Sequence, residues 1–193
     1  MRALLLAAAL IAPAALAQEV RVEPRLFVKD HHYFLSGGLT WLERGDYYNS
    51  PGAVFSGSYY LRESDAVEIR AVIFASWLGS SGSQVVNSTG LVPDSHRPVS
   101  LLAAGWRHSL AYGKVALAGS ILHFDVQGGG DLGTLLTDRA LTPAACGFFG
   151  VVARLGNHFY GQLDLALVGS LEQRSSAVFA VGFLPLLTLG GWL

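Results

Sequence analysis

The fold of this chain can be inferred from one segment, Val67-Glu68-Ile69-Arg70-Ala71-Val72-Ile73-Phe74-Ala75-Ser76-Trp77. Every odd position in it is apolar, whereas Glu68, Arg70 and Ser76 stand on the other face. Successive side chains of a strand point to opposite faces, so this alternation predicts a β-strand with one apolar face and one face that carries charges.

The same alternation returns in residues 122–127 and 159–167, again with charged or amide side chains on the second face. Weaker versions cover Tyr33 to Trp41, Phe55 to Leu61, Leu102 to Trp106, Phe149 to Leu155, and Ala177 to Phe183. Together these segments predict about eight strands, and bacterial membrane barrels have an even number of strands.

The composition indicates that the apolar face of the strands meets lipid. Of the 193 residues, 51% are hydrophobic and 14% are charged, and the mean hydropathy is +0.41, whereas soluble domains carry about 25% charged residues. Past residue 17 no apolar run reaches the ~20 residues of a spanning helix, and a closed β-barrel is the other structure whose backbone is satisfied in lipid. We therefore predict an all-β fold, a transmembrane antiparallel up-and-down β-barrel. The alternative is a soluble lipocalin-like barrel, whose apolar residues would lie inside.

The N-terminal segment MRALLLAAALIAPAALAQ (residues 1–18) has one cation, an apolar run and the small-residue ending Ala15-Leu16-Ala17. These are the features of a secretory signal peptide, and we expect cleavage after Ala17. A permanent N-terminal anchor is the alternative, but the run is short for a spanning helix. The expected organisation is a signal peptide over residues 1–17 and an outer-membrane β-barrel domain over residues 18–193.

The connections between the expected strands alternate in length. Arg62 to Asp65, Ser109 to Lys114 and Gly156-Asn157 read as tight turns, whereas Glu43 to Gly52, Gly79 to Pro98 and Asp138 to Ala144 read as longer loops. Short turns would face the periplasm and long loops the exterior. Residues 113–120 are expected to be a short helical or irregular segment.

Charged residues on the second face would point into the barrel. By the alternation these are Glu68, Arg70, Arg107, Asp125, Arg154 and Asp164, joined by His123 and other large polar residues. A barrel of about eight strands has room only for packed side chains, so these charges must be paired. We interpret them as a structural polar network that fills the lumen. A small, narrow channel is the alternative, and a wide aqueous pore needs more strands.

Six aromatic residues fall near the expected strand ends, where rings suit the headgroup region of a bilayer. They are Tyr33, Trp41, Tyr59, Trp77, Trp106 and Phe159. The alternative is a core role in a soluble sandwich.

Candidate chemistry is sparse. Asp94-Ser95-His96 contains the residue types of a hydrolytic triad, but adjacent residues rarely converge in that way. The six histidines lack the spacing of a metal site, and Gly128-Gly129-Gly130 is followed by no phosphate-binding pattern, so a bend or close strand packing explains it better. We expect no catalytic, cofactor or metal residues, and an enzyme acting on lipid or peptide through the outer loop remains the alternative.

Charge and cysteine content limit the partners. The formal net charge is −1 and no basic block is present, which argues against nucleic acid. A single cysteine, Cys146, leaves no internal disulfide. Outer-membrane lipid and other envelope proteins are the expected partners, with the oligomeric state open.

The stretch Tyr112-Gly113-Lys114-Val115-Ala116-Leu117, followed by residues 121–126 (ILHFDV) and the glycine run, resembles the outer-membrane β-barrel domain family of myxobacteria and related delta-proteobacteria. Residues 22–27, 56–77 and the Gly156-Asn157 turn are similar as well. The resemblance implies an eight-stranded barrel in the bacterial outer membrane and supplies no catalytic residues. The ending Gly190-Gly191-Trp192-Leu193 departs from the terminal aromatic residue of many barrels, so either Trp192 serves or the last strand stops near Leu184.

Some members of that family are associated with gliding motility. The expected function is a structural or interaction component of the cell envelope, and the resemblance adds a gliding-motility or envelope-spanning complex as one setting for it.

Overall fold

The computed structural model describes residues 27–117, 120–172 and 179–193. The expected signal peptide, and the first two residues of the segment expected from Ala177, lie outside these ranges. Within them, no helix has both the length and the apolar character needed to cross a membrane.

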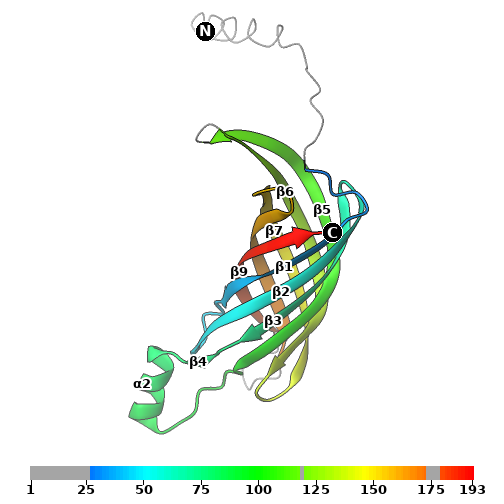
Figure 1. Cartoon of the computed structure of the whole chain (residues 1–193). Helices are drawn as coiled ribbons and strands as arrows, with labels where there is room; N and C mark the ends of the chain where they lie inside the picture. Colours follow the sequence, from blue (N-terminus) through cyan, green and yellow to red (C-terminus); the bar gives the residue numbers. More distant parts are fainter. Residues whose placement is uncertain (1–26, 118–119, 173–178) are drawn as a thin grey trace, which may run out of the picture.

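Eight long antiparallel strands close into a barrel (Figure 1). Each strand pairs with the next along the chain, and β1 also pairs with β9, which leaves the sheet without an edge. The eight are β1 (Tyr33–Leu42), β2 (Tyr48–Arg62), β3 (Asp65–Phe74), β5 (Pro98–Leu117), β6 (Ser120–Thr137), β7 (Leu141–Arg154), β8 (Phe159–Leu171) and β9 (Phe179–Trp192). The predicted fold class is confirmed, and each of the eight predicted strands overlaps one of these.

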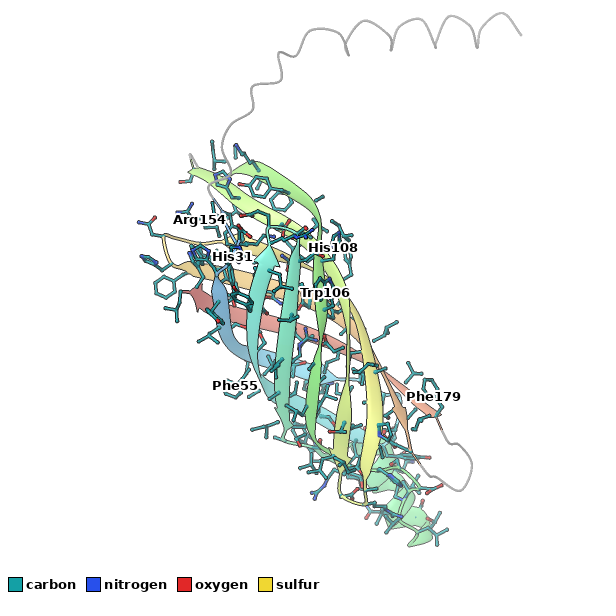
Figure 2. The ribbon with its side chains drawn as sticks, turned by 90° about the vertical axis from the view of Figure 1, so that its right-hand side faces the viewer. His31, Phe55, Trp106, His108, Arg154 and Phe179 are labelled. Carbon is teal, nitrogen blue, oxygen red and sulfur yellow. The ribbon has the colours of Figure 1, made fainter. Side chains whose placement is uncertain are left out.

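The apolar faces of the strands point outward. Ile69 is 62% exposed and Leu132 is 74% exposed, whereas Glu68 and Arg70, on the opposite face of β3, are each 2% exposed. Figure 2 shows side chains such as Phe55, Trp106 and Phe179 projecting away from the wall. An apolar exterior around a charged interior is the arrangement of a barrel that crosses a membrane, and it is the reverse of a lipocalin-like core.

The barrel has two distinct ends. At one end, named here the turn end, lie the start of β1, the C-terminus, and the β2–β3 and β7–β8 turns (Figure 1). At the other end, the loop end, the chain between β3 and β5 forms the short strand β4 (Trp77–Leu78) and the helix α2 (Ser80–Thr89). Three residues, 138–140, separate β6 from β7, so the longer loop predicted there is wrong.

The exposed aromatic residues gather near both ends. Tyr33 and Tyr59 lie 4.6 Å apart between ring centroids toward the turn end, and Trp41 meets Trp77 edge-on at 6.3 Å toward the loop end. Trp106 and Phe159 are exposed at the turn end. These positions match two interfacial girdles.

Strands β5 and β6 extend beyond their neighbours at the turn end. The last β5 residue paired with β3 is His108, whereas β5 continues to Leu117. The tight turn predicted at Ser109 to Lys114 is therefore wrong, and so is the irregular segment over residues 113–117. Residues 118 and 119 of that predicted segment lie outside the described residues. A bulge between Ser109 and Ala111 shifts the register and breaks the period-two pattern, which hid the continuing strand.

The last strand passes through Pro185 and ends at Trp192, so the alternative that it stops near Leu184 is wrong. Pro185 brings no backbone N–H to the ladder. Its carbonyl oxygen accepts a hydrogen bond from Thr40 Oγ1 at 2.7 Å, which ties β9 to β1 at this point. Trp192 is the terminal aromatic, and its ring faces the interior, 5.5 Å from Phe27.

Candidate functional site

The lumen is the part of the molecule where charged side chains converge. At mid-height a central ionic layer lies across the axis, and its guanidinium groups come from two strands, β3 and β5. Its members are Glu68, Arg70, Arg107, Asp131 and Asp164. All five are buried, with Arg107 only 1% exposed.

Arg107 joins the two sides of this layer. Its Nε donates to Glu68 Oε2 at 2.7 Å, and its Nη2 donates to Asp164 Oδ2 at 2.8 Å. Nη1 donates to Gln127 Oε1 at 3.2 Å, and Gln127 in turn bonds the Tyr60 hydroxyl. A guanidinium whose three nitrogens all donate hydrogen bonds can be buried at a lower cost, because its donors are paired.

Arg70 forms the second bridge. It donates to Glu68, and its Nη1 lies 3.1 Å from Asp131 Oδ2. Both guanidiniums also lie over the ring of Phe148, with the central carbon of Arg70 4.8 Å and that of Arg107 4.4 Å from the ring centroid. Cations over an aromatic face are attracted to its π-electrons, so the ring stabilises both charges.

Glycine makes room for this layer. Gly150 pairs with Asp164 across β7 and β8, and a Cβ on Gly150 would lie 2.1 Å from Asp164 Oδ1. Gly105 stands opposite Asp131 in the same way, with 2.5 Å to Oδ1. Each of these carboxylate side chains therefore lies against a glycine, which has no side chain, on the neighbouring strand.

Apolar clusters lie on both sides of the ionic layer. Toward the loop end the interior is filled by aliphatic and aromatic side chains, including Leu42, Val54, Leu101, Leu135 and Leu184. Toward the turn end, Phe27, Phe34, Tyr60, Tyr160 and Trp192 form an aromatic plug. The lumen is thus apolar at two levels, whereas the alternation of residues predicted a polar filling.

The segment before β1 enters the turn end. The ammonium of Lys29, 1% exposed, binds Asp125 and Ser109 and lies 4.9 Å from the centre of the Tyr60 ring. The backbone N–H groups of Lys29 and Asp30 both donate to Glu63 Oε1 at 3.1 Å. This segment, named here the latch, closes the mouth at the turn end and is held by the Lys29–Asp125 ion pair together with the backbone bonds to Glu63.

A second buried cluster closes the loop end. Arg44 donates to Glu172, to Asp46 at 2.6 Å and to the carbonyl of His96. The Nδ1 of His96 lies 3.9 Å from Glu172 Oε2. The three residues considered as a triad are split here: Ser95 and His96 are buried in the mouth, whereas Asp94 is exposed.

The structure brings together most of the residues proposed from sequence for the lumen. Glu68, Arg70, Arg107 and Asp164 lie in the central ionic layer, and Asp125 pairs with Lys29. His123 is buried near the turn end, where its Nδ1 lies 2.6 Å from the Tyr112 hydroxyl.

Arg154 is separate from the central layer. It is half-buried at the β7–β8 turn, where its Nε donates to the Gly156 carbonyl at 2.8 Å. It lies 6.0 Å from the Trp192 ring, outside the aromatic plug.

The residues predicted for the lumen did not include Asp131. Extending the alternation from Asp125 through the glycine run would have reached it. Lys29, Arg44 and Glu172 had no signal in the sequence, because they lie outside the regular part of the strands. Among the residues that the structure describes, no group of three His, Cys, Asp or Glu side chains could hold a metal ion.

Comparison with known proteins gives likenesses of fold alone. No family model and no curated protein matches the chain. Among solved structures, the N-terminal β-barrel domain of Pseudomonas aeruginosa OprF is 12% identical over 85% of this chain and 98% of that one, with a TM-score of 0.48. The attachment invasion locus protein Ail of Yersinia pestis is 10% identical over 85% and 99%, with a TM-score of 0.43. A de novo designed transmembrane β-barrel is 12% identical over 86% and 98%, with a TM-score of 0.43.

Proposed function

We propose that this protein is a structural or interaction component of the bacterial outer membrane. One observation carries the proposal: buried side chains occupy the interior toward the loop end, at mid-height and toward the turn end, while the outer wall is apolar. A filled barrel offers partners its wall and its two ends, and it has little room for a transport path.

The two ends supply distinct contact surfaces. At the loop end α2 stands away from the barrel, and at the turn end the β5–β6 hairpin continues past its neighbours (Figure 1). The resemblance of residues 112–117 and 121–126 to the myxobacterial barrel family lies in this hairpin. We extend the proposal from it: the turn end contacts a periplasmic component of an envelope-spanning complex, of the kind used in gliding motility.

The enzyme alternative has less support. Ser95 and His96 are buried at the loop end, with exposed fractions of 3% and 4%. A hydrolase acting on lipid needs its nucleophile within reach of the substrate.

Thiol accessibility tests the membrane placement. Cys146 is buried, so its background labelling should be low. A Ser81→Cys variant in α2 should react with an impermeant maleimide on whole cells, whereas Asn157→Cys at the turn end should react only after the outer membrane is opened. Labelling of both on whole cells, or of neither until lysis, would contradict the placement.

Photo-crosslinking tests the interaction role. A photoreactive amino acid at Val115, 46% exposed in the hairpin, should give a discrete protein adduct in intact envelopes. The same group at Leu132 on the lipid-facing wall is the matched control and should give none. Equal protein adducts at the two positions, or none at Val115, would count against a periplasmic partner there.

A further inference from the structure

The lipid-facing wall carries a groove where one side chain is missing. Leu35, Gly57, Ile69 and Ala104 stand side by side across four strands, in register. Along this row, the large side chain of Leu35 is followed by the bare Gly57, then by the large side chain of Ile69 and the small one of Ala104. Leu35 and Ile69 form ridges, each more than half exposed, on either side of Gly57.

Two adjoining hollows follow from this row. One, of about 520 Å³, lies over Gly57 and Ala104 and is bounded by Tyr33, Tyr59 and Val67. The second, of about 440 Å³, continues past Phe55 toward Ala71. Both are lined by Leu35, Gly57 and Ile69, so together they make one groove from the turn end toward the middle of the wall, named here the wall groove.

The width of the wall groove limits what kind of group can bind in it. Leu35 and Ile69 are two strand spacings apart, about 9.6 Å between backbones, and their side chains take part of that span. A helix with its side chains needs about 10–12 Å. The remaining width suits a single hydrocarbon chain.

The position of the groove indicates which leaflet of the membrane would supply the bound lipid. Its larger hollow lies in the turn-end half, next to the paired Tyr33 and Tyr59 rings, which match the level of the headgroups. The Tyr59 hydroxyl lies 3.4 Å from Nδ1 of His31, a polar rim where the apolar lining ends. We propose that the wall groove binds one acyl chain of a glycerophospholipid from the turn-end leaflet. This inference rests on the membrane placement in the proposed function.

Filling the groove is the test, and the chain offers a matched control. A Cβ on Gly57 would meet only the Leu35 side chain, at 3.3 Å, so Gly57→Leu fills the hollow with a small adjustment. Gly147 on β7 also faces outward and a Cβ there would meet nothing within 4 Å, so Gly147→Leu adds the same side chain elsewhere on the wall. Ala104→Leu is a second filling variant if Gly57→Leu does not fold.

The full mature chain, refolded in detergent micelles, would be titrated with dioleoyl phosphatidylethanolamine and followed by native mass spectrometry. The unmodified protein and Gly147→Leu should retain one lipid at low lipid ratios, and Gly57→Leu about tenfold less. Equal retention by all three proteins would overturn the proposal. A lipid-free dimer that Gly57→Leu abolishes would overturn it too, since a second copy would then be the occupant. Insertion of all three into vesicles is scored separately, so a failure of membrane placement is distinguishable from a failure of lipid binding.

Discussion

Arg107 and Asp164 meet inside the barrel, with 2.8 Å between Nη2 and Oδ2, although they are 57 residues apart in the chain. Arg107 comes from β5 and Asp164 from β8, two strands that do not pair with each other. The contact therefore crosses the lumen and ties opposite walls together. Its geometry depends on barrel closure, and its removal would take a close cationic partner from a buried carboxylate.

Replacing Arg107 with Leu should destabilise the barrel by about 3–5 kcal/mol, because Glu68 and Asp164 would lose the partner they share. The free energy of unfolding would be measured by urea titration of the refolded protein in vesicles, with tryptophan fluorescence as the signal. Arg97→Leu, at an exposed position at the loop end, is the control and should cost less than about 0.5 kcal/mol. Similar costs for the two variants would show that the ionic layer is not a stabilising network.

Substituting Gly129 by Val should sharply lower the folded yield. A Cβ there would lie 2.1 Å from the Trp106 carbonyl oxygen and 2.6 Å from Cζ of Phe148, and neither group can move without disturbing the strands or the ionic layer. Heat-dependent migration on gels reports the folded fraction of a barrel. Gly147→Val, which adds the same bulk on the outer face, should fold normally; equal yields would contradict the close packing inferred at Gly129.

The latch before β1 should loosen when Lys29 is changed to Met. That change keeps an unbranched side chain, one atom shorter, but leaves Asp125 without its buried ammonium. Amide hydrogen exchange of residues 27–32 should become at least tenfold faster. Asp30→Asn, at a half-exposed neighbour, is the control and should leave exchange unchanged. Unaltered protection in Lys29→Met would mean that the packing of Phe27 and the backbone bonds to Glu63 hold the segment without the ion pair.

The reconstituted protein should show no steady conductance in planar bilayers. The ionic layer and the two apolar clusters fill the cross-section, and an eight-stranded barrel has an interior only wide enough for its own side chains. A general porin reconstituted in the same way provides the positive control. Reproducible single-channel steps from the purified barrel would revive the narrow-channel hypothesis.

Much of the barrel could be predicted from local pattern. Ile69 and Arg70 are neighbours whose side chains must diverge in a strand, and only a lipid exterior and a closed interior suit both. The pattern failed where the geometry itself departs from period two. The bulge at residues 109–111 hid the second half of β5, and Pro185 suggested an end that β9 does not have.

The alternation within single strands was enough to predict an antiparallel barrel and to say which side chains face outward. It also placed Glu68, Arg70, Arg107 and Asp164 on the inner face. Three features became visible only in the folded barrel: the pairing of the charges, the closure of the two mouths by Lys29, Arg44 and Glu172, and the groove in the wall at Gly57. Those features depend on strand register and barrel closure, which bring residues from distant parts of the chain together across the lumen or along the wall, and no local pattern contains that information.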